Sequence, residues 1–319
     1  MADRQPAPYL FVLHPQRCGS TLLQIMLTRH PAISVAPESM SLQKLLRRFP
    51  TTGPLTTEQV AVVQRLVDND AKLKAWKLDV TPYLETVRGY TAGITLRQII
   101  DDQLRFYRDQ VSPNAQVIGY KKGNMAEQAE LLHALMPEAR FIFIYRDARA
   151  AAASMIKNLR GYDALRAARK WRQRVWLARH FKRQHPGALL EVRYETLVES
   201  PVETTQAICA FIGAPYRDDI LEYYQDNVQG EMIIGGKETI HRHTSEPIST
   251  RHMDKWKAQL SEHDVAIIEA ITGDDMQRYG YSLLRPVLPA KSRLRCIAAR
   301  WQDTRAMQKR LRWYRQGIK

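Results

Sequence analysis

The stretch "LHPQRCGSTLLQIML", residues 13–27, joins an apolar run to a polar turn and then to an apolar helical pattern. The turn contains Arg17, Gly19, Ser20 and Thr21. A strand, a tight turn and a helix start offer free backbone N–H groups and a positive dipole end to phosphate. The turn lacks the Lys of the nucleoside-triphosphate loop, G-x-x-x-x-G-K-[ST]. The pattern therefore predicts a phosphate site of another kind.

Apolar strand patterns and helical patterns alternate along the chain. Strands are predicted at 9–13, 117–119, 141–145 and 189–192, and helices at 21–28, 96–108, 127–135, 148–158 and 165–184. Short apolar strands such as "FIFIY" are typical of a sheet covered on both faces. This alternation predicts an α/β fold, a three-layer α/β/α arrangement with a central parallel sheet. Residues 40–95 are predicted to form a helical insertion in that fold.

The net charge of +15 over 319 residues is distributed unevenly. Residues 291–319 carry ten Lys or Arg against one Asp, which accounts for +9 of the +15. The remainder is ordinary for a protein that binds an anionic cofactor. No helix-turn-helix, RNP or zinc motif accompanies the charge, so we expect no specific nucleic-acid partner.

No stretch of the sequence is apolar over the eighteen residues that a membrane span needs. The first residues, "MADRQPAPYLFVLHP", contain acidic and Pro residues where a signal peptide needs a long apolar region. Cys18, Cys209 and Cys296 are far apart and have no metal-site spacing. We therefore expect a cytoplasmic protein with reduced thiols.

A second segment, "FIFIYRDARAAAASMIKN" at 141–158, places Arg146 at the end of a predicted strand and Ser154 two helical turns later. Ligands of parallel α/β sheets bind at the carboxyl ends of the strands. The planar guanidinium of Arg also suits phosphate. The alternative is a local ion pair between Arg146 and Asp147, with Ser154 only a small helix residue.

Taken together, "RCGSTLL" and "YRDARAAAAS" resemble the two cofactor motifs of the sulfotransferase superfamily, whose donor is 3′-phosphoadenosine 5′-phosphosulfate (PAPS). "GYKKGN" (119–124), "VRYETLVESP" (192–201) and "MDKWK" (253–257) are similar to further motifs of that family, in the same order. The resemblance covers about residues 8–258. It is nearest to the tyrosylprotein, carbohydrate and bacterial natural-product branch, with a P-loop-like fold.

The resemblance implies the roles of individual residues. It places the 5′-phosphosulfate on the loop residues Arg17, Cys18, Gly19, Ser20, Thr21 and Leu22, and the 3′-phosphate on Arg146 and Ser154. It places Tyr194, Ser245, Lys255 and Trp256 near the nucleotide. Lys121 and Arg17 would neutralise charge that develops during transfer, Glu38 would be the general base, and no metal is needed. The product of the donor would be 3′-phosphoadenosine 5′-phosphate (PAP).

The sequence departs from the family pattern at three places. Cys18 stands where Ser is usual, and Ala148 stands where Pro is usual. Lys122 and Gly123 replace Thr-Pro, so that either Lys121 or Lys122 could be the catalytic lysine. Glu38 also has an alternative role, as an acidic residue at the start of the helix that follows it.

The resemblance and the charge distribution together suggest two parts. Residues 1–285 would form the sulfotransferase domain, with the insertion at about 40–95 on the acceptor side, and residues 286–319 a basic amphipathic helix. The apolar residues of this helix are Leu294, Ile297, Trp301, Met307, Leu311, Tyr314 and Ile318. Three roles remain open for it: packing on its own domain or in a homodimer, docking an acidic carrier protein, or lying on a membrane surface.

The sequence leaves the acceptor unidentified: a hydroxyl or amine of a small molecule, peptide, lipid or carrier-bound natural product. Activation of a carrier-bound chain for elimination is one variant of this chemistry. Two alternatives belong to other classes. A P-loop-type kinase would need the missing loop Lys. A non-catalytic nucleic-acid binder would use the basic tail and bind with a steep dependence on salt.

Overall fold

A five-stranded parallel sheet forms the centre of the computed structural model, which describes residues 9–226 and 246–318. The strands are β1 (Tyr9–Leu13), β2 (Ile33–Ala36), β3 (Val117–Lys121), β4 (Arg140–Tyr145) and β5 (Leu189–Arg193), in the order β2-β3-β1-β4-β5. All four strand pairs are parallel. The four predicted strands are present, and the sequence analysis missed β2.

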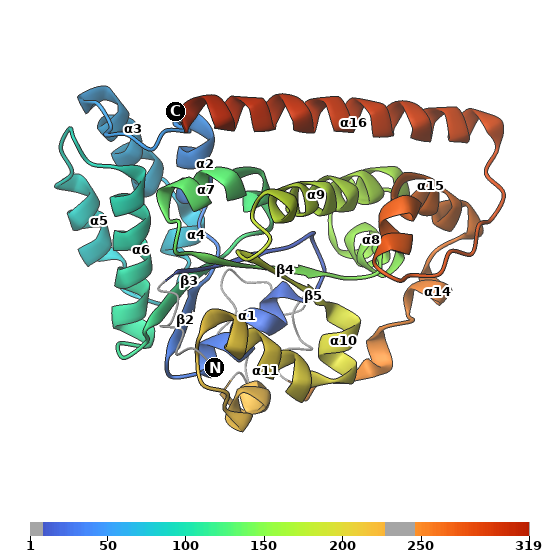
Figure 1. Ribbon diagram of the computed structural model, residues 1–319, viewed down its shortest axis with the longest axis horizontal. Helices are drawn as coiled ribbons and strands as arrows, with labels where there is room; N and C mark the ends of the chain where they lie inside the picture. The colour runs from blue at the N-terminus through green and yellow to red at the C-terminus, as the bar shows by residue number, and fades with distance from the viewer. Residues whose placement is uncertain (1–8, 227–245, 319) are drawn as a thin grey trace.

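Alternate residues of the strands supply two separate cores. Phe11 of β1 and Phe141 of β4 belong to a core with the helices of one face, whereas Leu10 and Ile142 belong to a core with the helices of the other face. A period of two along a strand sends successive side chains to opposite faces. The predicted three-layer α/β/α fold is therefore confirmed (Figure 1).

Each face of the sheet has its own helices. The smaller core contains α1 (Ser20–Arg29), α10 (Tyr194–Glu199) and α11 (Pro201–Ile212). The larger core contains α6 (Leu96–Val111), α7 (Ala129–Leu135), α8 (Ala148–Asn158), α9 (Ala164–Gln184), α15 (Glu262–Arg278) and α16 (Ala290–Gly317). Short elements complete the described chain: η1 (Gly123–Gln128), η2 (Asp218–Glu222), α12 (Tyr223–Asp226), η4 (Thr250–His252) and α14 (Trp256–Gln259).

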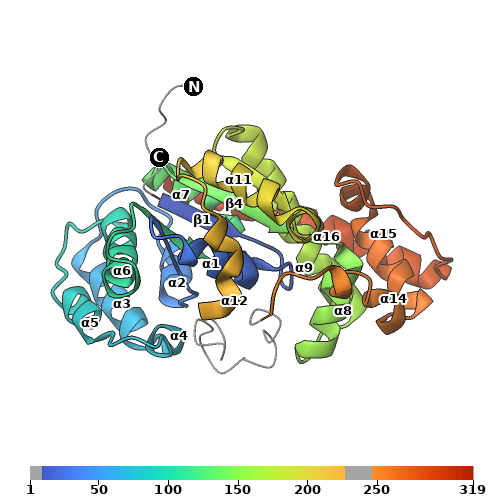
Figure 2. The same cartoon turned by 90° about the horizontal axis from the view of Figure 1, so that it is seen from below.

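The predicted helical insertion is present between β2 and α6. It consists of α2 (Ser41–Arg48), α3 (Thr57–Asp68), α4 (Ala71–Lys74) and α5 (Thr81–Arg88). Thr56 and Gln59 form a capping box at the start of α3, which satisfies backbone N–H groups there. The insertion lies at one end of the molecule, and α14 and α15 lie at the other (Figure 2).

The predicted C-terminal helix is α16, which packs against its own chain. Its buried side chains are Cys296, Ala299, Asp303, Met307, Leu311 and Tyr314. Tyr314 accepts a hydrogen bond of 2.7 Å on its hydroxyl oxygen from Gln128. None of the described helices has the length and apolar character that a membrane crossing requires.

The predicted apolar residues of this helix do not all face the domain, because those of its first half are exposed. Leu294, Ile297 and Trp301 are 68%, 57% and 56% exposed. The smaller residues Cys296 and Ala299 face the domain in their place, with 3% and 4% exposure. Small side chains allow α16 to approach its neighbours closely, which residue hydrophobicity alone did not predict.

Asp303 is the polar anchor of α16, and it generates a stability prediction. It is 2% exposed and accepts hydrogen bonds from Arg169 Nε at 3.0 Å and Nη2 at 2.7 Å, and from Gln173 at 2.9 Å. In Asp303→Asn, an amide NH₂ would face these donors and the charge would be lost. We expect the free energy of unfolding to fall by about 2 kcal/mol in urea titrations. Gln302→Ala, on the exposed side, should match the wild type; equal stability of both variants would contradict this role.

Candidate active site

The loop between β1 and α1 is held in its shape by Gly19. This residue has φ of +83°, and a Cβ built on it would lie 2.3 Å from Cδ2 of Tyr194. Only Gly has both the conformation and the small size that this position needs. No side chain caps α1, so the N–H groups of its first turn remain available to an anion.

Arg17 connects this loop to α8, which covers the face of the sheet opposite to α1. Its Nε donates a hydrogen bond of 2.9 Å to Oγ of Ser154, 137 residues away in the sequence. Burial, and then the nearby charge of Arg146, lowers the pKa of Arg17. The structure thus brings together two cationic residues and one hydroxyl that the sequence analysis had predicted to bind phosphate.

Arg146 follows the end of β4 and is held by contacts on several sides. Its guanidinium lies 4.5 Å from the ring centre of Tyr194, and its Nη2 donates to the carbonyl of His252 at 2.8 Å. Its own carbonyl accepts a hydrogen bond from Trp171 at 2.9 Å. Its Nε is buried and has no hydrogen-bond partner within the described chain. A buried, unsatisfied guanidinium donor beside Arg17 is suited to an anionic ligand.

The alternative of a local Arg146–Asp147 ion pair does not occur. Asp147 instead caps α8, accepting from the N–H of Arg149 at 2.8 Å, and it forms an ion pair of 2.6 Å with the Arg149 guanidinium. Arg149 also contacts Glu269 at 2.8 Å. Glu195 accepts the backbone N–H of Asp147 at 3.0 Å. Because these groups satisfy one another, Asp147 leaves the charge of Arg146 uncompensated.

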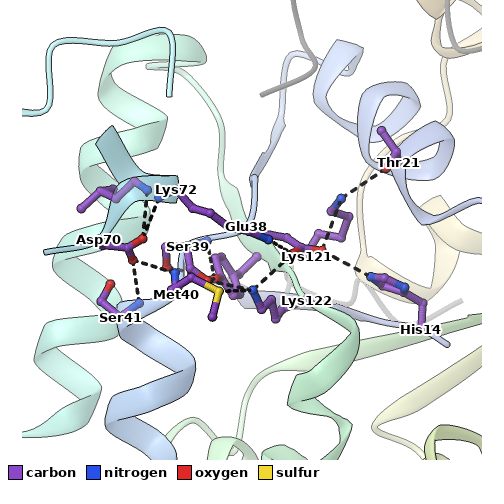
Figure 3. Close-up of polar contacts among 12 residues, drawn as sticks. His14, Thr21, Glu38, Ser39, Met40, Ser41, Asp70, Lys72, Lys121 and Lys122 are labelled. Atoms are coloured by element: carbon purple, nitrogen blue, oxygen red, sulfur yellow. Dashed lines mark hydrogen bonds and ion pairs between the residues drawn. The ribbon is translucent and has the colours of Figure 1, made fainter. Parts of the chain in front are cut away.

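A second cluster surrounds Glu38, which follows β2 (Figure 3). The carboxylate lies 2.8 Å from Nζ of Lys72, 3.2 Å from Nζ of Lys122 and 3.9 Å from Nζ of Lys121. Lys121 also donates to Oγ1 of Thr21, in the first turn of α1 directly after the loop, at 3.3 Å. Lys121 is therefore the lysine that joins Glu38 to the loop.

Lys122 points to the other side of Glu38. Besides Glu38, it donates to the carbonyl of Ser39 at 3.0 Å and contacts the sulfur of Met40 at 3.5 Å. The sequence left open which lysine faces the loop. Of the two, the described contacts link only Lys121 to a side chain of the first turn of α1.

The charges of this cluster alter the acidity of its members. Burial alone would raise the pKa of Glu38, but Lys121, Lys122 and Lys72 outweigh it and hold that pKa well below its usual range. Burial lowers the pKa values of Lys121 and Lys122, while Glu38 opposes that change. Glu38 is therefore ionised at neutral pH and is available to accept a proton.

His14 is a member of the cluster that the sequence analysis missed. Burial, and then Lys121, lowers the pKa of His14 from 6.5 to about 4, so the ring is neutral at pH 7. Its Nδ1 lies 2.9 Å from the carbonyl of Pro15, and its Nε2 lies 4.0 Å from Glu38. A Cβ at Gly123 would lie 2.9 Å from this ring, so the Gly that replaces the family's Pro makes room for His14.

Glu38 is not the acidic residue of the helix that follows. Helix α2 begins at Ser41, and its first turn contains no acidic residue. Asp70 of the insertion instead accepts the N–H groups of Met40 and Ser41, both at 2.6 Å. The alternative role for Glu38 is therefore wrong, because a carboxylate from another part of the chain occupies that position.

The backbone around Glu38 is fixed from β3 and from the insertion. The hydroxyl of Tyr120 accepts the N–H of Ser39 at 2.7 Å. Trp76 Nε1 donates to the carbonyl of Glu38 at 3.4 Å. These contacts fix the segment that carries the carboxylate, so its position does not depend on the lysines alone.

The other predicted residues of the loop and of the start of α1 are buried or half-buried. Cys18 is fully buried, and burial raises the pKa of its thiol, which leaves its backbone as the group able to meet a ligand. Ser20 begins α1 and is buried, whereas Leu22 is half-buried against the smaller core. Within the described residues, no group of three or more His, Cys, Asp or Glu side chains is arranged to hold a metal ion.

The residues predicted to lie near the nucleotide differ in their burial and in their contacts. Trp256 is 5% exposed, packs with Ala150 and Ala153, and lies 4.3 Å from the Arg149 guanidinium. It therefore supports α8, the helix that carries Ser154. Lys255 is exposed beside it, with no contact to the loop among the described residues. Ser245 lies outside the described residues.

Comparisons with known proteins show the family of the chain. Residues 8–218 match a family model described as the sulfotransferase family. The chain is 22% identical over 289 residues to Protein-tyrosine sulfotransferase 1 of Danio rerio, which covers 86% of this chain and 72% of that protein.

Two solved structures share the fold. One is the sulfotransferase domain of the olefin synthase of Synechococcus PCC 7002, at a TM-score of 0.61 and 22% identity, covering 89% of this chain and 98% of that one. The other is the sulfotransferase domain from the curacin biosynthetic pathway, at a TM-score of 0.57 and 19% identity, covering 88% and 99%.

Gly19→Ala tests the geometry of the loop. The substitution adds a Cβ in the left-handed region and against the ring of Tyr194, so we expect unfolding to become easier by on the order of 2 kcal/mol, measured by thermal denaturation. Gly187→Ala is the matched control, because a Cβ there meets nothing within 4 Å. Adding Tyr194→Ala should remove the steric part of the loss only. Equal stability of the two single variants would contradict the constraint.

Proposed function

The chain belongs to the sulfotransferase family, and on that premise we propose that it transfers the sulfuryl group of PAPS to a hydroxyl or amine acceptor. The observation that carries the proposal is the pairing of Arg17 with Ser154 beside Arg146, whose charge Asp147 leaves uncompensated. Lys121 beside Thr21 is a second cationic element, and cationic groups at two places suit a donor with phosphates at two positions.

The residues present fit this donor. The first turn of α1, Thr21 and Lys121 would hold the 5′-phosphosulfate, and Arg146 with Ser154 would hold the 3′-phosphate. When bound, PAPS supplies a sulfuryl group for in-line displacement, a reaction that resembles phosphoryl transfer and depends on positioning and charge. Lys121 takes the role of the missing loop Lys, since its ammonium group reaches Thr21 from the neighbouring strand.

Glu38 is the proton acceptor in this proposal. Its carboxylate is ionised, is held by the segment after β2, and lies beside Lys121. The low pKa makes it a weak base toward a free alcohol. Transfer of the proton as the acceptor oxygen or nitrogen bonds to sulfur removes this difficulty, because the acceptor becomes more acidic at that moment. His14, neutral and 4.0 Å away, adds a second basic nitrogen beside Glu38.

Lys121 and Arg17 provide positive charge where negative charge develops. Both side chains are at least half-buried, so solvent screens them little. Lys122 and Lys72 hold Glu38 from its other sides. Lys72 belongs to the helical insertion, and its side chain is 43% exposed. The insertion therefore reaches the reacting groups from the acceptor side.

The class of the acceptor is inferred from the relatives and not from contacts in the site. The names of the relatives refer to protein tyrosine, an olefin synthase and a curacin pathway, so they span peptide and natural-product acceptors. We propose a hydroxyl or amine of one of these classes, free or carrier-bound. A kinase is the weaker candidate, because the family match and the Lys-free loop both oppose it.

The test is transfer of radiolabelled sulfur from PAPS, without added metal, to a panel of a tyrosine-containing peptide, an oligosaccharide and a β-hydroxyacyl carrier protein. Labelling of one acceptor class by the wild type and not by Arg146→Ala would support the proposal. Transfer of label from γ-labelled ATP instead, with none from PAPS, would overturn it.

Glu38→Gln separates proton transfer from donor binding. We expect the rate of sulfuryl transfer to fall by about 10²- to 10⁴-fold, because an amide cannot accept the proton. The KM for PAPS should stay the same or decrease, since one negative charge leaves the cationic site. Glu58→Gln, on the exposed start of α3, is the matched control. A Glu38→Gln enzyme with wild-type turnover would show that the proton goes elsewhere.

A further inference from the structure

Exposed apolar side chains concentrate where the chain enters α16. Eight large apolar side chains are exposed in the described part of the protein, and five of them lie within residues 284–301. These are Leu284 at 65%, Val287 at 94%, Leu294 at 68%, Ile297 at 57% and Trp301 at 56%. Scattered exposed apolar residues are ordinary, but a group confined to eighteen residues indicates a contact surface.

Three of these residues share one side of α16. Leu294, Ile297 and Trp301 are spaced three and four residues apart, which aligns them along a helix. The opposite side, through Cys296, Ala299 and the residues after them, is buried against the domain. Figure 1 shows α16 along one edge of the molecule, with no described element outside it. We call this side the outer face of α16.

The outer face is also strongly basic. The only acidic residue of α16, Asp303, is buried against Arg169, and the basic residues Arg300 and Arg310 pair with Asp274 and Glu127 of the domain. Six other basic residues of the helix make no ion pair in the described part of the chain: Lys291, Arg293, Arg295, Arg305, Lys309 and Arg312. Arg315 instead contacts His180 of α9 at 2.9 Å. The guanidinium of Arg305 lies over the ring of Trp301, which places positive charge directly beside the apolar stripe.

We propose that the outer face of α16 is a docking surface for an anionic lipid membrane. Charge decides against a second copy, because two such faces would bring like charges together. Shape favours lipid over an acidic protein. The stripe lies on the convex side of a single helix, and a fluid interface accepts Leu, Ile and Trp side chains without a matching pocket. Lys and Arg beside them attract anionic headgroups.

The experiment is flotation of the full chain with vesicles at low salt. One set of vesicles is phosphatidylcholine alone, and the other is an equal mixture of phosphatidylcholine and phosphatidylglycerol. The wild type should float with the anionic vesicles, remain in solution with phosphatidylcholine, and lose binding as salt rises. Leu294→Glu/Trp301→Glu should bind at least roughly tenfold more weakly, because two apolar anchors are lost and two negative charges are added.

The matched control is Val111→Glu/Val202→Glu, which makes the same charge change at exposed apolar residues elsewhere. It should float like the wild type. Three outcomes would overturn the proposal: no flotation of the wild type with anionic vesicles, equal flotation with both lipids, or equal loss in the control. A wild-type dimer in gel filtration that the α16 variant converts to a monomer, without vesicle binding, would assign the face to a second copy instead. Because flotation needs neither donor nor acceptor, its failure leaves the proposed function unaffected.

Discussion

The parallel pairing of β1 with a strand on each side is the constraint on which the site depends. Val12 pairs with Lys121 of β3, and Leu13 pairs with Phe143 of β4. Parallel strands end at the same edge of a sheet, so the loop after β1 lies between the residues that follow its two neighbours. Lys121 and Arg146 therefore flank the loop, although they lie more than a hundred residues from it in the sequence.

The second consequence is a concentration of positive charge around the start of α1. Burial, and then the charge of Arg146, lowers the pKa of Arg17, and three lysines share the single carboxylate of Glu38. Like charges gathered in a partly buried site are costly unless a ligand or a functional state accounts for them. Asp147 is the carboxylate nearest to Arg146 in the sequence. It forms an ion pair with Arg149 and therefore does not neutralise Arg146.

The sequence was sufficient for the fold class and for four of the five strands, because their apolar runs are bounded by clear turn residues. It missed β2, whose four residues lie between Pro31 and Pro37. That strand positions Glu38, since Ala36 pairs with Tyr120 directly before the two lysines. The motif resemblance predicted Arg17 and Arg146, and it left Lys121 and Lys122 as alternatives; their roles stay predictions. The position of His14 just before the loop could have indicated that it belongs to the site. Nothing in the sequence near Lys72 indicates this, because only the packing of the insertion brings Lys72 to Glu38.

In the proposed site, Lys121 beside Thr21 and Arg146 beside Ser154 bind one doubly phosphorylated nucleotide. Titration calorimetry of the wild type with PAP in the absence of metal, beside ATP with Mg²⁺, tests it most directly. We expect micromolar or tighter binding of PAP, loss of that binding in Arg146→Ala, and no preference for Mg-ATP. Absence of PAP binding, or tighter binding of Mg-ATP, would contradict it and would mean that the loop after β1 serves a different phosphate.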